Sequence, residues 1–255
     1  MLSRSKIKFI LSLQKRKARE EHRMFIAEGD KIVKEIIASG FPVKSLICKP
    51  EYLAVIPVAA REMIEEIIPV KYEELKQLSN LTTPHNAMAV IRMPDYRMDL
   101  DEMLQEIVPA LDFIQDPGNM GTIIRAAAWF GIKNIICSLN CVDIYNPKVI
   151  QATMGAFLNV KVHYCDLPEF LGSVIKKKVP VFGTVLNGKS IYEHDLGGKG
   201  IILIGNESKG ISEELMTFVT DRITIPKFCD EKYGIESLNA GMAASIIFSE
   251  FRRQG

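Results

Sequence analysis

The chain has 255 residues, of which 47% are hydrophobic and 25% are charged, an ordinary composition for a soluble globular protein. This length is enough for one large domain or two small ones. The net charge of +1 excludes a polycation, so any contact with nucleic acid must depend on a local basic region.

The first element of the chain is such a basic region. Between Arg4 and Arg23, eight lysines and arginines stand against two glutamates, an excess of six positive charges. A segment of this kind can attract a phosphate backbone, but it can equally be the solvated face of a helix. The charge pattern alone does not separate these two interpretations.

Residues 1–93 are expected to form a small α/β domain. Apolar positions near helical spacing predict a helix over residues 6–14. Asp30 is expected to cap a second helix, which Gly40 would end. Strands are predicted at residues 25–28, 43–48, 67–72 and 87–92, with a short helix at 73–78.

Residues 94–102 are polar and begin with proline, so we expect them to form a linker to a second domain at residues 103–255. In this domain, short and almost entirely apolar strands alternate with helical patterns, which indicates a parallel sheet covered on both faces. The strands are predicted at residues 110–114, 134–137, 160–163, 181–185, 201–204 and 222–225. Ligands of such sheets bind beyond the carboxyl ends of the strands.

Three short segments lie at these strand ends. In Asn119-Met-Gly-Thr-Ile-Ile-Arg125, the asparagine can cap a helix and the arginine can bind a phosphate or a developing alkoxide. The glycines of Gly205-Asn-Glu-Ser-Lys-Gly210 permit close approach to a ligand. After Ile225-Pro226, the segment Ser237-Leu-Asn239 opens a helix rich in small residues. Each segment also has a simple explanation as a cap or a turn, so none is specific alone.

Two residues outside the three segments carry further expectations. Ser212 is predicted to cap the helix after the second segment, which would leave backbone amides free to bind an anion or a carboxylate. Trp129 falls among apolar residues and is expected in the core. The lysine spacing excludes a Walker loop, and no G-x-G-x-x-G follows an early strand, which disfavours a dinucleotide-binding fold.

The cysteines and histidines predict neither disulfides nor a metal site. The five cysteines are odd in number and form no C-x-x-C pair, and the four histidines are scattered. No apolar run approaches the length that spans a bilayer, and charges near the N-terminus argue against a signal peptide. A reduced, cytoplasmic protein without a membrane or metal partner is expected.

Considered together, the three segments resemble the signature motifs of the SpoU (TrmH-like) family of RNA ribose 2′-O-methyltransferases, within the SPOUT class. Asn119 to Arg125 resembles the first motif and Gly205 to Gly210 the second, while Ile225-Pro226 with Ser237-Leu-Asn239 resembles the third. Phe25-Ile-Ala-Glu-Gly29, after the basic region, is similar to the family's accessory RNA-binding domain, which has a ribosomal-protein-like α/β fold. The resemblance covers nearly the whole chain.

The resemblance implies a fold, a cofactor and partners. The C-terminal domain would be an α/β knot, meaning a trefoil-knotted, mostly parallel sheet with helices on both faces, and the smaller N-terminal α/β domain would bind RNA. S-adenosylmethionine would be the cofactor, and a homodimer would form through the knot domain. The substrate would be a ribose 2′-hydroxyl, with ribosomal RNA the first choice and tRNA the second.

The resemblance also assigns roles to residues of this sequence. The catalytic residues would be Asn119, Arg125, Glu207, Ser237 and Asn239. The cofactor would be held at Thr184, Val185, Gly205, Asn206, Gly210, Ile225, Pro226 and Leu238. The candidate RNA ligands in the basic region are Arg4, Lys6, Lys15, Arg16, Lys17, Arg19 and Arg23.

Two stretches depart from the family pattern. Residues 153–159 lack the serine-rich start and the arginine that many relatives carry, which weakens any RNA contact there. The third-motif loop at residues 227–236 is longer than the compact form, and its tip is expected to differ in conformation.

From the residues alone, two other classes of protein remain open. A non-catalytic RNA-binding module would rest on the basic N-terminus, and a nucleotide-binding enzyme would use Gly205 to Gly210 as a phosphate loop.

Overall fold

The computed structural model describes residues 2–230, 234 and 236–255, so the tip of the long third-motif loop lies outside the described residues. The chain forms two compact units. The first unit contains Met1–Asp95 and Asp143–Leu158, and the second contains Tyr96–Val142 and Asn159–Gly255. Asp143–Leu158 thus belongs to the first unit, although the sequence pattern places it within residues 103–255.

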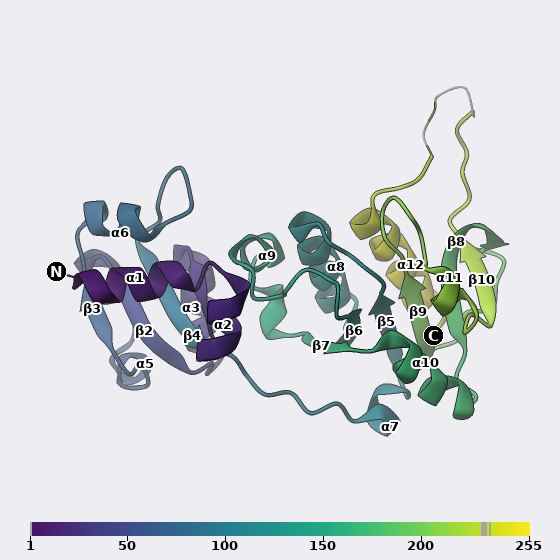
Figure 1. The fold of residues 1–255 in the computed structure, drawn as a ribbon, viewed down its shortest axis with the longest axis horizontal. Helices are drawn as coiled ribbons and strands as arrows, with labels where there is room; N and C mark the ends of the chain where they lie inside the picture. The colour runs from purple at the N-terminus through teal and green to yellow at the C-terminus, as the bar shows by residue number, and fades with distance from the viewer. Residues whose placement is uncertain (1, 231–233, 235) are drawn as a thin grey trace. The chain divides into compact units, whose positions relative to one another are not determined.

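The first unit is built on a four-stranded mixed sheet (Figure 1). Its strands are β1 Met24–Glu28, β2 Val43–Cys48, β3 Ile67–Pro69 and β4 Ala87–Arg92, in the order β1-β4-β2-β3. β4 pairs antiparallel with β1 and β2, and β2 pairs parallel with β3. The helices are α1 Arg4–Ser12, α2 Arg16–His22, α3 Asp30–Ala38, α4 Pro50–Ala54, α5 Val58–Glu62, α6 Tyr72–Leu78 and α9 Pro147–Thr153, followed by the 3-10 turn η1 Ala156–Leu158. All four predicted strands are therefore present.

One predicted cap in this unit is wrong. Gly29 is the N-cap of α3, and Asp30 is already inside the helix. The Asp30 carboxylate instead accepts hydrogen bonds from the backbone N and the side-chain Nδ2 of Asn86, at 2.8 and 2.6 Å. Asp30 therefore ties the start of α3 to the residue preceding β4 rather than capping its own helix.

Arg19 and aromatic packing explain why Asp143–Leu158 belongs to the first unit. The Arg19 side chain is only 2% exposed, and its guanidinium donates to Asp143 Oδ2 at 2.5 and 2.8 Å. The same guanidinium donates to the carbonyls of Leu13 and Gln14. The ring of Phe25 lies 4.6 Å from that of Tyr145, between ring centroids. A buried charge of this kind is tolerated only when it is paired and fully hydrogen-bonded.

The second unit contains a six-stranded sheet in which every neighbouring pair is parallel (Figure 1). The strand order is β10-β8-β9-β5-β6-β7. The strands are β5 Ile107–Leu111, β6 Asn134–Ser138, β7 Lys161–Cys165, β8 Val181–Ser190, β9 Gly200–Ile204 and β10 Asp221–Thr224. The helices are α7 Leu100–Met103, α8 Pro117–Trp129, α10 Leu167–Lys176, α11 Glu213–Met216 and α12 Ala240–Gln254. The prediction of a parallel sheet is confirmed.

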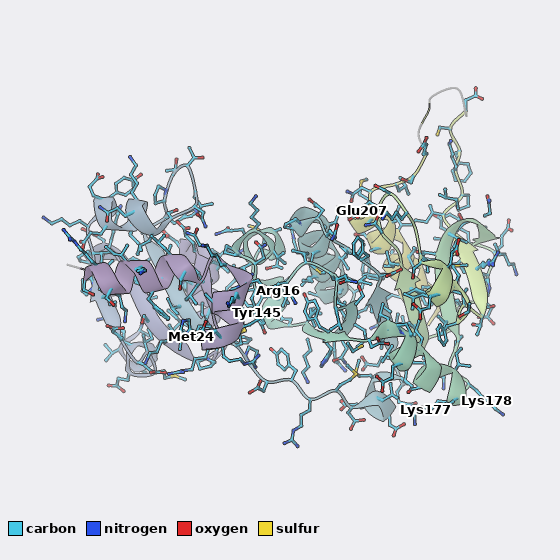
Figure 2. The ribbon with its side chains drawn as sticks, viewed as in Figure 1. Arg16, Met24, Tyr145, Lys177, Lys178 and Glu207 are labelled. Atoms are coloured by element: carbon cyan, nitrogen blue, oxygen red, sulfur yellow. The ribbon has the colours of Figure 1, made fainter. Side chains whose placement is uncertain are left out.

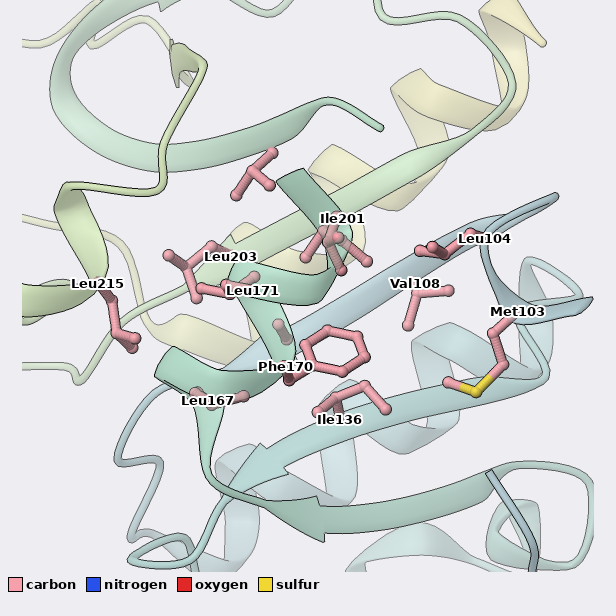
Figure 3. Packing of buried hydrophobic residues seen from close by; sticks show 13 residues of the cluster. Met103, Leu104, Val108, Ile136, Leu167, Phe170, Leu171, Ile201, Leu203 and Leu215 are labelled. Atoms are coloured by element: carbon pink, nitrogen blue, oxygen red, sulfur yellow. The ribbon is translucent and has the colours of Figure 1, made fainter. Parts of the chain in front are cut away.

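Both faces of this sheet are buried, as the continuous apolar strands predict. On one face, Ile201 and Leu203 of β9 pack in a cluster with Phe170 and Leu171 of α10 (Figure 3). Because side chains alternate along a strand, Ile202 and Ile204 point to the opposite face, and they are buried too. The part of the chain that the structure describes contains no helix long and apolar enough to cross a bilayer.

The long strand β8 is interrupted by a large bulge at its carboxyl end. Gly183 pairs with Arg222 of β10, but the next residue of β10, Ile223, pairs with Lys189. Residues 184–188 therefore leave the ladder between two paired positions. Gly188 lies so close to β10 that a Cβ at that position would come within 2.6 Å of the Ile223 carbonyl carbon. The bulge begins at Thr184, which is the first predicted cofactor contact.

A close approach between α8 and α12 gives a stability prediction. A Cβ on Gly241 would lie 2.8 Å from the Thr122 side chain, whereas a Cβ on Gly172 in α10 would meet nothing closer than Phe218, at 3.8 Å. Glycine-to-alanine changes normally stabilise a helix by up to about 1 kcal/mol. We expect Gly172→Ala to follow this rule and Gly241→Ala to lower the free energy of unfolding by about 1–3 kcal/mol because of overpacking. Urea unfolding of both variants measures this, and equal stabilisation would refute the close packing.

Candidate active site

Three of the five predicted catalytic side chains form one hydrogen-bonded chain. Asn119 donates from Nδ2 to Glu207 Oε1 at 2.7 Å, and Asn239 donates from Nδ2 to Asn119 Oδ1 at 2.6 Å. Since a carboxylate can only accept, the amide of Asn119 must present its nitrogen to Glu207 and its oxygen to Asn239. Glu207 follows the carboxyl end of β9 (Figure 2), and α8 starts just beyond the carboxyl end of the adjacent β5.

The two asparagines occupy different positions at the starts of their helices. Asp116, not Asn119, is the N-cap of α8, and its carboxylate accepts from the backbone N of Asn119 at 2.8 Å. The predicted capping role of Asn119 is therefore wrong, and its side chain is free to bridge the other two residues. Asn239 does cap its helix, since Oδ1 accepts from the backbone N of Gly241 and of Met242.

The second motif is a closed loop. The backbones of Asn206 and Gly210 exchange two hydrogen bonds, each 2.9 Å long. Asn206 Nδ2 donates to Glu207 Oε2 and to the Phe113 carbonyl, while its Oδ1 accepts from two amides of the loop. A Cβ on Gly205 would lie 2.2 Å from the Gly210 carbonyl carbon, so only glycine fits there. The backbone N–H groups of Asn206 and Gly210 are thus used in hydrogen bonds within the loop, and these bonds fix the shape of the loop.

The start of the helix after this loop binds a carboxylate of the chain itself, and Ser212 is its N-cap residue. The backbone N of Ser212 donates to Asp112 Oδ2 at 2.8 Å, and the Ser212 side chain makes no capping bond to α11. Of the two expected ligands of these amides, an anion or a carboxylate, the structure shows a carboxylate, that of Asp112. This arrangement argues against the alternative in which Gly205 to Gly210 serves as a phosphate loop.

The loop after β5 contributes residues that the sequence analysis missed. Phe113 has a φ of 58°, a left-handed conformation that is uncommon for a bulky residue and often occurs at functional sites. Its N–H donates to Ser138 Oγ, and its carbonyl accepts from Asn206. Nothing in the sequence signals this conformation. By contrast, an aspartate directly before a proline is a recognised helix start, so Asp116 could have been found.

Cys141 forms hydrogen bonds that support the loop after β5. Its Sγ accepts from the backbone N of Ile114 at 3.3 Å and lies 3.4 Å from Ser138 Oγ. The side-chain hydrogen bond with Cys137 lowers the pKa of Cys141 to about 7, with Ser138 and the Ile114 amide adding to the effect and burial opposing it. All five cysteines are free thiols.

The other two predicted catalytic residues do not join the hydrogen-bonded chain. Arg125 follows Asn119 by six residues, which places it about 120° away around α8. Its side chain is exposed and makes no hydrogen bond or ion pair with the described residues. Ser237 is likewise exposed, and no described residue bonds to its hydroxyl.

Trp129 shares the exposed face of α8 with Arg125. Its indole is 85% exposed, so the expectation that it belongs to the core is wrong. The exposed residues Thr122, Arg125 and Trp129 recur every three or four positions, which places them in one stripe along the helix. Met242 near the start of α12 is also exposed.

The predicted cofactor residues lie in the bulge of β8 and in the loops after β9 and β10, and these three strands are neighbours in the sheet. Thr184 donates from Oγ1 to the Leu203 carbonyl at 3.0 Å, which anchors the start of the β8 bulge. Ile225 and Pro226 are half-buried. Three apolar side chains on or next to these loops are exposed, namely Leu186, Phe228 and Leu238.

The predicted RNA ligands in the first unit fall into three groups. Arg4, Lys15 and Lys17 are exposed and form no ion pair with a described residue. Lys6, Arg16 and Arg23 pair with Glu66, Glu20 and Asp95 respectively. Arg19 is enclosed by protein oxygens, as described above, so its guanidinium is not available to bind RNA.

Among the described residues, no group of three histidine, cysteine or acidic side chains could hold a metal ion.

Comparison with known proteins identifies both parts of the chain. Residues 106–249, more than half of the chain, match the model of the SpoU rRNA methylase family. Residues 4–89 match the MRM3-like substrate-binding domain.

Relatives and solved structures agree with these matches. Human "rRNA methyltransferase 3, mitochondrial" is 27% identical, with 95% of this chain and 70% of that protein covered. The Bacillus subtilis 23S rRNA (guanosine(2553)-2′-O)-methyltransferase RlmP is 27% identical over 97% of this chain and 96% of its own length. A putative TrmH-family RNA methyltransferase from Porphyromonas gingivalis superimposes with a TM-score of 0.89 at 34% identity over the full length of both chains. The SpoU methyltransferase AviRb from Streptomyces viridochromogenes, in complex with AdoMet, gives 0.83 at 25% identity, covering 99% and 98%.

The contact between Asn119 and Glu207 predicts a pH-dependent defect. Asn119→Asp would place two carboxylates about 2.7 Å apart, where mutual repulsion raises the pKa of the pair in the folded state. A carboxyl group whose pKa is higher in the folded than in the unfolded state destabilises the fold once the pH exceeds its unfolded-state pKa. The loss of stability should therefore be small at pH 5 and larger at pH 8. Asn119→Ala removes both hydrogen bonds of the Asn119 side chain without adding charge, so its loss of stability should not change with pH. Urea midpoints of both variants at the two pH values test this, and parallel behaviour would contradict the geometry.

Proposed function

The chain belongs to the SpoU rRNA methylase family and is an S-adenosylmethionine-dependent RNA methyltransferase, and we propose that it methylates a ribose 2′-hydroxyl in ribosomal RNA. One observation carries the assignment of the site: Asn239, Asn119 and Glu207, from three distant segments, form a single hydrogen-bonded chain beside the carboxyl ends of β5 and β9. Ligands of parallel sheets bind at this edge.

The residues present fit the cofactor. The β8 bulge and the loops after β9 and β10 combine exposed apolar side chains with backbone that leaves the strand ladder, a mixture suited to a ligand with a flat adenine and a polar tail. We assign the apolar contacts to Leu238 and to the β8 bulge after Thr184, with Ile225 and Pro226 beside them. When bound, S-adenosylmethionine supplies an activated methyl group on a sulfonium, so the protein has chiefly to position the attacking oxygen in line with it.

We assign Arg125 to the developing charge on that oxygen. A guanidinium stays protonated in proteins, so it is a poor general base but a good partner for an alkoxide and the adjacent phosphate. The proton of the 2′-hydroxyl would pass to this phosphate or to water. Asn119 and Glu207 would orient the ribose, and Ser237 and Asn239 would shape the cofactor loop.

Ribosomal RNA is the preferred substrate, with tRNA second. Both relatives named above have rRNA methyltransferase names, and both match nearly the whole of this chain. The first unit matches a substrate-binding domain and carries the exposed cations Arg4, Lys15 and Lys17. The nucleotide specified in the Bacillus subtilis relative's name is a candidate to test first.

We further propose a homodimer in which Arg125 serves the site of the partner copy. Arg125 and Trp129 form an exposed stripe on α8, and Trp129 is 85% exposed. Arginine and tryptophan are both enriched at protein–protein interfaces. Asn119 of the same helix already points elsewhere, to Glu207 and Asn239. A two-fold partner packed on the stripe would cover Trp129 and bring Arg125 to a second hydrogen-bonded chain.

The remaining parts of the proposal concern topology and location. A trefoil knot in residues 103–255 is supported by family membership and by the return of α12 to pack on α8. A cytoplasmic location is supported by five cysteines that are all free, although the human relative has a mitochondrial name.

Methyl transfer to RNA from cells lacking the gene tests the function. The wild-type protein should introduce ribose methylation at defined sites of ribosomal RNA, mapped by resistance to alkaline cleavage. Arg125→Lys should lose about 100-fold or more of its single-turnover rate, since one preorganised donor to an oxyanion contributes on this scale. Calorimetry should show that its affinity for S-adenosylmethionine is unchanged. A wild-type rate for this variant would remove Arg125 from the chemistry, and cofactor binding without transfer to any RNA would overturn the function.

Mixing inactive variants tests the shared site. Arg125→Ala and Glu207→Ala should each be inactive, but subunit exchange would give heterodimers with one intact site, which restores about a quarter of wild-type activity. If Arg125 serves its own chain, the mixture stays inactive. Asn119→Ala with Glu207→Ala is the matched control, because both changes fall in one hydrogen-bonded chain and cannot complement each other.

A further inference from the structure

The first unit contains a groove of about 1310 Å³ that no step above uses. Residues from the start of α1, from α4 and from the start of α6 line it, together with the segment that follows β3. It therefore lies beyond the carboxyl ends of β2 and β3, the parallel pair of this sheet. Figure 1 shows α6 beside α1, and the two helices are in contact.

The most distinctive feature of the groove is an aromatic ring with a cation above it. Lys49 Nζ lies 5.0 Å from the centroid of the Tyr72 ring, and Tyr72 is 36% exposed. The other tyrosine of the groove, Tyr52, is buried, and its hydroxyl donates to the Asp30 carbonyl, so it supports the fold. Tyr72 is thus the ring that the groove presents to a ligand.

The charges of the groove nearly balance. Arg4, Lys49 and Lys71 stand against four acidic side chains. Two of the four are engaged: Asp30 accepts from Asn86, and Glu74 accepts from the backbone N of Leu2 and of Lys71. A nearly neutral groove with an exposed ring and flanking lysines suits a flat, uncharged group joined to a phosphate, rather than a long stretch of nucleic-acid backbone.

We propose that this groove binds one unpaired nucleotide of the RNA substrate, with the base stacked on Tyr72 and the phosphate held by Lys49. The cation–π contact of an exposed lysine is weaker than base–aromatic stacking, so a base can displace the ammonium, which is then free to reach the phosphate. This inference rests on the proposed function only in taking RNA as the ligand.

Continuity with the basic region supports RNA as the occupant. Arg4 lines the groove and also opens α1, the helix that leads toward Lys15 and Lys17 at the start of α2. All three cations are exposed and free of ion pairs with described residues. A strand that contacts these cations would pass the mouth of the groove, where a single base could turn inward.

Binding of fluorescein-labelled decauridylate to the full-length protein, followed by anisotropy, tests this site. Tyr72→Ala should weaken binding at least about fivefold, as expected for loss of one base–aromatic stack, whereas Tyr72→Phe keeps the ring and should stay within about twofold. Lys49→Ala should weaken binding and reduce the salt dependence by about one phosphate contact. The matched control is Tyr192→Ala, which removes a half-exposed tyrosine of the second unit and should bind as wild type.

A second probe distinguishes the contribution of the base to binding from that of the phosphate. A decamer of abasic ribose phosphate should bind the wild-type protein about as weakly as decauridylate binds Tyr72→Ala. Equal affinities of Tyr72→Ala and Tyr192→Ala for decauridylate would overturn the proposal, and so would the absence of decauridylate binding by the wild-type protein. A defect in Lys49→Ala alone would also overturn it, because it would indicate a phosphate contact without base stacking. Thermal melting checks that Tyr72→Ala remains folded. None of these measurements involves methyl transfer, so the inference can fail while the proposed function stands, and the reverse.

Discussion

The side-chain amide of Asn119 joins segments that are far apart in the chain. Its partners Glu207 and Asn239 lie 88 and 120 residues further on. Because a primary amide offers donors on one atom and acceptors on the other, Asn119 can satisfy a carboxylate and a second amide at once. This requirement sets the starts of α8 and α12 and the loop after β9 relative to one another. The loop from Gly205 to Gly210 is held in shape by its own hydrogen bonds, which the backbone and the side chain of Asn206 make.

Some parts of this arrangement could be predicted from sequence and others could not. Every strand of both sheets has a predicted counterpart, because short apolar runs bounded by turns identify buried strands well. The strand predicted at residues 110–114 is misplaced, since β5 is Ile107–Leu111 and Phe113 lies in the loop after it. Helix caps are less reliable. Asp116 and Asn119 are both good capping residues three positions apart, and only the position of Glu207 shows which of the two is left free. The conformation of Phe113 has no sequence signal, since it results from tertiary hydrogen bonds on both sides.

Long-range burial explains the other corrections. Arg19 looks like one more cation in a basic run, but its partner Asp143 lies 124 residues away and removes it from solvent. Trp129 stands in an apolar stretch, yet its position on α8 places it in the stripe of Arg125, away from the buried face. In both cases the local sequence pattern does not show which face of the helix is covered. The side chains left uncovered on α8 are those that the proposed dimer would use.

The assignment of Asp143–Leu158 to the first unit changes what the boundary between the units means. The chain passes from one unit to the other three times, near residues 95, 142 and 158. Cleavage of the polar linker would therefore detach Met1–Asp95 but leave Asp143–Leu158, which is part of the first unit, covalently attached to the second unit. A fragment that begins at residue 103 would carry Tyr145 and Phe157 without the Phe25 ring that packs on them. The carboxylate of Asp143 would also lose Arg19. A fragment that begins at residue 103 therefore carries a piece of the substrate-binding unit, and that unit is incomplete without this piece.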